Sequence, residues 1–236
     1  MSELNAVLED LVAANRILAN EGVVDGFGHV SVRHPDWPDC FLLACSRAPA
    51  LVTREDLMVH GLTGEPVEAD RRPLYAERFI HSAIYELRPD VGAIVHNHSH
   101  AVIPFGVTGV PIRPLFHLAG IIGAAAPVWD IRTKFGDTNL LVTSQEQGRD
   151  LAMALGAGRV ALMRGHGCVV AAATLREAVM TAIYLQINAG LQMEALRLGE
   201  PVYLSPGEIE RSGKVSPLSL NRAWEYWLRR AGLGGP

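Results

Sequence analysis

The spacing of apolar residues predicts four helices. In these stretches an apolar side chain recurs every three or four residues, as it does along a helix that packs one face against a core. The stretches are 4–18 before the glycines of NEGVVDGFG, 74–87 before Pro89, 144–156, and 174–199. Ser144 and Thr174 stand where N-caps belong, and Glu177 can complete a capping box with Thr174.

Short runs rich in Val and Leu, separated by Pro, Asp and Gly, predict strands between these helices. They read HVSVRH, CFLLAC, DLMVH, VGAIV at 91–95, and RVALMRGHGCVVA at 159–171. The strands are grouped without a regular alternation with helices. We therefore expect a central sheet that is covered by helices.

Length and composition favour one domain over residues 1–236, with a C-terminal tail from about 205, because 49% of the residues are hydrophobic and no break in composition appears. A net charge of −4 argues against a nucleic-acid partner. No secretory signal or membrane-spanning run is visible, so we expect a cytoplasmic protein with no membrane partner. Cys40, Cys45 and Cys168 form no CxxC pattern, which predicts buried, reduced thiols.

Histidines gather where predicted strands end. HNHSH at 96–100 directly follows VGAIV, and if the strand continues, His96 and His98 share one face. His166 follows another apolar strand, between glycines that allow close approach of the backbone. Three neutral imidazoles with a free coordination position form an open metal site, and we predict His96, His98 and His166 as its ligands. The competing interpretation is that these histidines merely end polar strands.

Glu77 and His81 lie four residues apart on the predicted helix before the histidine strand, and so share a helical face. Glu77 could be a solvated carboxylate beside a surface histidine. It could also be a general acid/base at the site, or occupy the open position of the metal when substrate is absent.

Four linked segments, GFGHVSVR, AERFIHSAIYELRPDVGAIVHNHS, LMRGHG and the long helix that follows, resemble the class II aldolase/adducin family over roughly residues 4–205. The resemblance implies an α/β fold, a three-layer α/β/α sandwich with a mostly antiparallel central sheet. It also implies a homotetramer with active sites at subunit interfaces. In its terms, His96, His98 and His166 bind one divalent metal ion per subunit, and Glu77 is the catalytic acid/base.

The chain departs from the sugar-phosphate aldolases of that family where they hold a phosphate. Their SGN-type turn reads GFGH, ending in His29, and their TPSG-type loop reads ACSRAP, with Ser46 and Arg47. Their Ser-Ser pair before the glutamate is Tyr75 and Ala76. Guanidinium can grip a planar carboxylate with two parallel hydrogen bonds. We therefore expect His29, Ser46 and Arg47 to contact a small carboxylic-acid substrate; a surface arginine and a packing histidine are the alternatives.

GFGHVSVR, RPDV and IRPLFH are similar to the decarboxylase branch of the family. This implies a lyase that decarboxylates a hydroxylated aromatic, hydroxypyridine or ring-opened dienoic acid through an enolate that the metal stabilises. Glu77 would then return a proton to carbon. His117 is a further candidate for substrate binding, or a helix-start residue without a catalytic task. Tyr203 and the C-terminal aromatic residues could close the site or pack against a neighbouring subunit, and we expect the packing.

Three other functions compete with decarboxylation. A class II aldolase that cleaves a sugar phosphate or sugar acid would use the same metal and glutamate, but yield two carbonyl-containing fragments. A binding module like the adducin head needs no metal ligands. An iron-dependent oxygenase would require oxygen. Zn²⁺ suits the three histidines best, while Mn²⁺, Fe²⁺ or Co²⁺ fits if substrate oxygens complete a larger shell.

Overall fold

A seven-stranded sheet forms the centre of the protein in a computed structural model that describes residues 2–124 and 126–233. Its order is β3-β2-β1-β4-β7-β6-β5, and neighbouring strands are antiparallel except for the parallel pair β5 and β6. The strands are β1 (His29–Arg33), β2 (Cys40–Ala44), β3 (Leu57–Gly61), β4 (Ala93–Asn97), β5 (Val128–Trp129), β6 (Val160–Met163) and β7 (Gly167–Ala172). The mostly antiparallel sheet that the family resemblance implied is confirmed.

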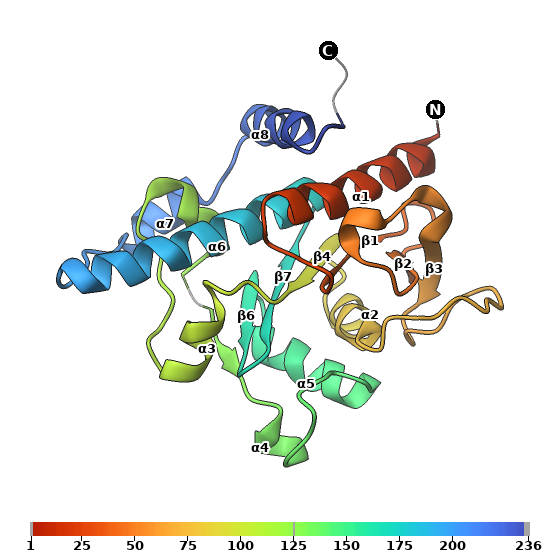
Figure 1. The fold of residues 1–236 in the computed structure, drawn as a ribbon, viewed down its shortest axis with the longest axis horizontal. Coiled ribbons are helices and arrows are strands. Elements are labelled where there is room, and N and C mark those ends of the chain that lie inside the picture. The colour runs from red at the N-terminus through yellow and green to blue at the C-terminus, as the bar shows by residue number, and fades with distance from the viewer. Residues whose placement is uncertain (1, 125, 234–236) are drawn as a thin grey trace.

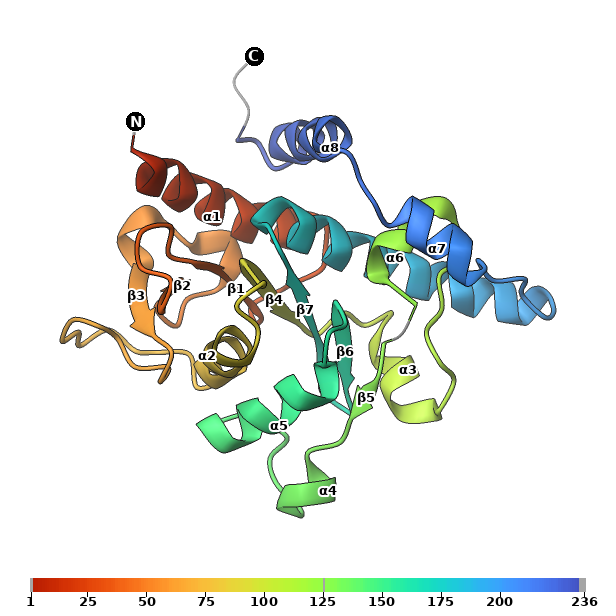
Figure 2. The same cartoon turned by 180° about the vertical axis from the view of Figure 1, so that it is seen from behind.

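Helices cover both faces of the sheet, which completes three layers (Figures 1 and 2). One apolar cluster joins the sheet to α1, α6 and α8, and a second joins it to α2 and α5. The helices are α1 (Glu3–Asn20), α2 (Arg78–Leu87), α3 (Ile103–Thr108), α4 (Arg132–Phe135), α5 (Gln145–Leu155), α6 (Leu175–Leu198), α7 (Pro206–Ser212) and α8 (Pro217–Arg230), with 3₁₀ turns η1 (Pro49–Leu51), η2 (Arg54–Asp56) and η3 (His117–Ile122).

The two clusters explain why the central strands read as continuous apolar runs. Successive side chains of a strand point to opposite faces, so Leu42 joins the cluster under α1 and α6 while Leu43 joins the cluster under α2. In β4, Val95 and Ile94 divide in the same way. Because both faces are covered by helices, a strand gains from an apolar residue at every position.

Two sequence-based boundaries differ from the structure. The segment 159–171, expected as one strand, forms a hairpin of β6 and β7, because Gly165 turns the chain with a φ of +65°. The helix expected from residue 74 begins at Arg78. The long helix does have the predicted capping box of Thr174 and Glu177, and Ser144 caps α5.

The segment from about 205, expected as a C-terminal tail, forms α7 and α8. Trp224 and Trp227 of α8 are buried in the apolar cluster that contains α6. These aromatic residues therefore pack within their own chain. Figure 1 shows α8 beside α1 and α6. None of the three cysteines forms a disulfide. Within residues 2–124 and 126–233, every helix is too short or too polar to cross a membrane.

Replacing Gly148 of α5 with alanine should destabilise the fold by about 1–3 kcal/mol, because overpacked cores cost energy of this order. An added Cβ would lie 2.3 Å from the carbonyl oxygen of Phe79 in α2, and a backbone atom cannot move away cheaply. Urea unfolding followed by circular dichroism measures the effect. The control is Gly190→Ala in α6, where nothing lies within 4 Å of the new Cβ. It should be neutral or stabilising, and equal midpoints for both variants would contradict this account of the α2–α5 contact.

Candidate metal centre and adjoining cavity

Four side chains from three parts of the chain meet at one end of the sheet. His96 lies on β4 and His98 just beyond it, His166 lies in the turn between β6 and β7, and Glu77 directly precedes α2. One ligand atom from each of the four lies within 4.8 Å of all the others. The His98 Nε2 atom is 3.1 Å from Nε2 of His96 and 3.0 Å from Nε2 of His166.

The pairing of β4 with β7 brings these histidines together. His96 is opposite Val169, so the hairpin turn that carries His166 lies beside the end of β4. A Cβ at Gly167 would lie 2.2 Å from the carbonyl oxygen of Asn97, so only glycine allows this approach. The glycine that follows His166 therefore serves strand packing, which in turn positions the histidine.

The hydrogen bonds of the cluster fit a divalent cation. His96 Nδ1 lies 3.1 Å from the carbonyl oxygen of Cys168, and a carbonyl can only accept, so Nδ1 carries the hydrogen. His96 Nε2, the other ring nitrogen, faces the remaining ligand atoms, and a histidine that binds a carbonyl oxygen through one nitrogen in this way is typical of metal sites. Burial, reinforced by His96 and His166, lowers the pKa of His98 to about 4. Three neutral imidazoles and a carboxylate are a donor set that can hold a divalent metal ion.

Glu77 contributes the carboxylate, and its side chain is buried. One oxygen lies 3.5 Å from His96 Nε2 and 3.4 Å from His166 Nε2. The other accepts a hydrogen bond of 3.0 Å from the backbone N–H of Val142. Burial by itself would raise the pKa of Glu77, but His96 and His166 outweigh it and hold this pKa well below its usual range. Glu77 is therefore an anchored, ionised carboxylate, which rules out the solvated carboxylate considered from the sequence.

The role of Val142 was not visible in the sequence, because a backbone N–H leaves no residue-type signal. The segment before α5 brings this N–H to Glu77, and within it Leu140 has a φ of +68°. Such a conformation is rare for a non-glycine residue and often accompanies functional sites. The neighbouring Leu141 lines the cavity described next.

A cavity of about 390 Å³ adjoins the cluster and contains three of the predicted substrate-binding residues. Its lining includes His29, Ser46, Arg47, Tyr75, Glu77 and His98. Arg47 is exposed to solvent, and its Nε donates to the carbonyl oxygen of Leu51 at 2.8 Å and lies 3.3 Å from a carboxylate oxygen of Asp56. These contacts fix the base of the guanidinium group. The structure thus places His29, Ser46 and Arg47 beside the candidate metal ligands.

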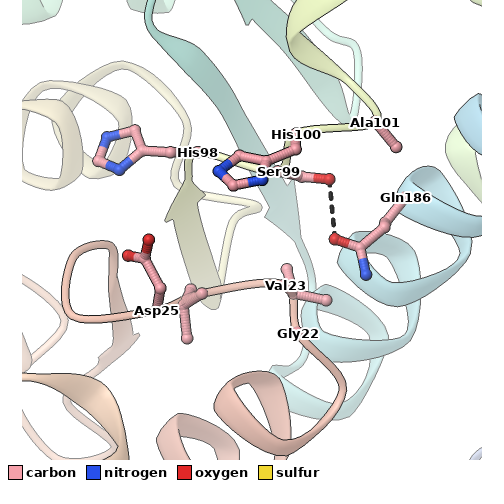
Figure 3. Close-up of a pocket in the computed structure, with 9 residues that line it drawn as sticks. Gly22, Val23, Asp25, His98, Ser99, His100, Ala101 and Gln186 are labelled. Carbon is pink, nitrogen blue, oxygen red and sulfur yellow. Dashed lines mark hydrogen bonds between the residues drawn. The ribbon is translucent and has the colours of Figure 1, made fainter.

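His98 also borders a second cavity, of about 350 Å³ (Figure 3). Figure 3 shows His98 and Asp25 on one side of this space and, on the other, Ser99 hydrogen-bonded to Gln186 at 2.8 Å. His100 is exposed at its rim. The candidate metal centre therefore borders two cavities through His98.

His117 does not join this group within one chain. It begins η3, as the helix-start interpretation expected, and η3 packs against α6 and α7. His117 lines a separate cavity with residues of α6 and α8. Tyr203 likewise packs inside its own chain: Arg113 stacks on its ring and Gln192 donates to its hydroxyl at 3.2 Å.

One alternative considered from the sequence made His81 a surface histidine, and this is wrong. His81 lies on α2, is fully buried, and contacts β1. Its Nε2 atom lies 2.6 Å from Nδ1 of His29, and its Nδ1 atom lies 2.6 Å from Oγ of Ser31. The one signal in the sequence was the amphipathic pattern of the helix, on whose apolar side His81 falls between Ile80 and Ile84.

Comparison with known proteins agrees with this geometry. The class II aldolase and adducin N-terminal domain matches residues 9–193. The chain is 31% identical over 250 residues to decarboxylase tropJ of Talaromyces stipitatus, covering 95% of this chain and 93% of that protein. It is 29% identical over 238 residues to the 3,4-dihydroxyphthalate decarboxylase of Arthrobacter keyseri, covering 94% and 92%.

The solved structures agree as well. L-fuculose 1-phosphate aldolase from Glaciozyma antarctica PI12 superimposes with a TM-score of 0.79 at 25% identity, covering 98% of this chain and 91% of that one. The sheet order, the cluster of one glutamate and three histidines, and the match over most of the chain lead to one conclusion. The chain belongs to the class II aldolase and adducin family.

Proposed function

We propose that the protein is a metal-dependent lyase that decarboxylates a hydroxylated aromatic, hydroxypyridine or ring-opened dienoic carboxylic acid. One observation carries the proposal: the cavity beside Glu77 and His98 is lined by His29 and Arg47, two groups that can hold a carboxylate. The names of the two decarboxylase relatives support the same reaction class. Of the candidate metals we favour Zn²⁺, because three imidazoles with an open coordination position are typical of its catalytic sites.

Each residue has a defined task in this proposal. His96, His98 and His166 would hold a divalent cation, which when bound stabilises negative charge on a substrate oxygen as the carbon–carbon bond breaks. Arg47 and His29 orient a carboxylate against the cluster, and Ser46 offers a hydroxyl beside them. Glu77 takes up and returns a proton at its carboxylate oxygen. The backbone N–H of Val142 positions this carboxylate where the histidine cluster meets the cavity.

We further propose a homotetramer, as the family resemblance implied, and a location in the cytoplasm. His117 would then contribute to substrate binding only across a subunit boundary, since it lines a separate cavity of its own chain. Sedimentation of the purified protein tests the assembly.

Carbon dioxide release tests the proposed reaction. Purified protein is supplied with hydroxy-aromatic, hydroxypyridine and hydroxy-dienoic acids, with the metal present and after chelation. Metal-dependent release from one of these acids is the expected result. Production of two carbonyl-containing fragments from a sugar phosphate or sugar acid, without carbon dioxide from any of these acids, would instead establish the aldolase alternative. A requirement for oxygen would indicate an oxygenase.

Replacing Arg47 with methionine should lower kcat/KM for the carboxylic acid about 10-fold or more, mainly through KM, because a charge-assisted hydrogen bond is lost. Steady-state kinetics measures this effect. The control is Arg54→Met on the neighbouring η2 turn, because Arg54 does not line the cavity. Equal losses in both variants would contradict a specific contact between Arg47 and the substrate.

A further inference from the structure

A chain of hydrogen bonds runs from the cavity into the core behind His29. Nδ1 of His29 meets Nε2 of His81 at 2.6 Å, Nδ1 of His81 meets Oγ of Ser31 at 2.6 Å, and Oγ of Ser31 meets the hydroxyl of Tyr85 at 2.9 Å. All four side chains are buried, with exposed fractions of 4% for His29 and at most 1% for the others. β1 supplies His29 and Ser31, and α2 supplies His81 and Tyr85.

The two hydroxyl groups fix the direction of this chain. Ser31 and Tyr85 each carry one hydrogen that needs an acceptor, and a buried donor without one costs about 1–3 kcal/mol. Within the described residues, these hydroxyls have only two contacts that can receive the hydrogens: the one between them and the one from Ser31 to His81. Both hydrogens are accommodated only if Tyr85 donates to Ser31 and Ser31 donates to His81 Nδ1.

That direction determines the hydrogens on both histidines. Since His81 Nδ1 accepts, the hydrogen of His81 is on Nε2 and is donated to Nδ1 of His29. His29 Nδ1 then accepts, so the hydrogen of His29 is on its Nε2 atom, at the opposite side of the ring. A second hydrogen on His81 would lie on Nδ1 and leave the Ser31 hydroxyl hydrogen without an acceptor. A second hydrogen on His29 would lie on Nδ1, facing the N–H of His81, so one of the donors in the chain would again lack an acceptor.

We infer that Tyr85, Ser31 and His81 are positioning residues that hold His29 as a neutral Nε2–H donor at the wall of the cavity. Such a donor recognises an acceptor oxygen, such as that of a carboxylate, and rejects an ammonium group, which can only donate. His29 and Arg47 then present hydrogen-bond donors to the same cavity, which selects for an anionic oxygen. Only the identity of that oxygen rests on the proposed function; the hydrogen-bond direction does not.

The direct test is ¹⁵N NMR of the full-length protein labelled at histidine, both chelated and loaded with Zn²⁺, near neutral pH. Protonated and unprotonated ring nitrogens have well-separated ¹⁵N shifts, and His29→Gln assigns the signals of His29. The expected spectrum shows the hydrogen of His29 on Nε2 and that of His81 on Nε2. A hydrogen on His29 Nδ1, or an imidazolium at either position, would overturn the inference.

A matched pair of variants tests the link to the substrate. His81→Met removes the donor to His29 Nδ1 at similar volume, whereas His81→Gln can still present an N–H there. We expect His81→Met to release His29 from its single tautomer and to lower kcat/KM for the carboxylic acid about 10-fold or more, with His81→Gln restoring much of both. Loss of activity in His81→Met with an unchanged His29 tautomer would contradict the positioning role. An Nε2–H tautomer in a protein that releases no carbon dioxide would leave this inference standing and reject the proposed function.

Discussion

Replacing His166 with alanine should remove the bound divalent metal and the lyase activity together. His166 Nε2 is 3.0 Å from His98 Nε2 and 3.4 Å from a carboxylate oxygen of Glu77, so its loss opens one side of the cluster. Metal catalysis contributes several kcal/mol to reactions of this kind, and we expect turnover to fall roughly 1000-fold or more. Metal content by mass spectrometry and carbon dioxide release, measured on the same samples, check both parts.

His100→Ala is the matched control, because this nearby histidine is exposed and is not part of the cluster. It should retain its metal. Chelation of the wild-type protein should reproduce the loss seen in His166→Ala, and added Zn²⁺ should restore activity to the chelated protein but not to the variant. Full activity in a metal-free His166→Ala protein would refute the proposed metal centre.

Glu77→Gln should keep the metal and lose turnover by about 100-fold or more, within the range for acid/base groups. Glutamine has nearly the same shape, and its amide oxygen can still accept from the N–H of Val142, so the segment before α5 stays in place. What disappears is the group that can take up and return a proton. Single-turnover kinetics with the Zn²⁺-loaded variant separates this loss from a loss of substrate binding.

Glu86→Gln, on the helix α2 that follows Glu77, controls for the change of charge. Glu86 pairs with Arg149 at 2.7 Å on α5 and does not line the cavity. This variant should retain the turnover of the wild type. If Glu77→Gln matched it, the proton role of Glu77 would be wrong, while metal lost from Glu77→Gln would assign Glu77 as a ligand instead.

Several strands and helices could be predicted from the sequence, because the spacing of apolar residues within each segment indicates them. The runs at β1, β2, β3 and β4 and the long helix with its capping box appear where apolar spacing placed them. The hairpin of β6 and β7 was missed because the run on either side of RGHG is equally apolar, so periodicity alone did not reveal the turn at Gly165.

The candidate site also has a part that local spacing predicts and a part that depends on tertiary packing. His96 and His98 could be predicted as a pair, because alternate residues of one strand share a face. Their meeting with His166 depends on the β4–β7 pairing, and their meeting with Glu77 on the packing of α2 against the sheet. Spacing within one segment cannot report such contacts; here the resemblance to the family supplied the expectation and the structure shows that the four residues converge.

The sequence by itself determined the helices α1, α2, α5 and α6 and the strands β1 to β4, and which residue types are available for metal and carboxylate binding. These follow from side chains a few positions apart. Only the tertiary structure decided that His81 is a buried partner of His29 and not a surface residue, that Val142 anchors Glu77, and that His117 faces another cavity. These contacts join residues 52 and 65 positions apart in the first two cases, and their geometry is set by how whole elements pack. Backbone groups and buried hydrogen-bond directions leave no trace in residue identity.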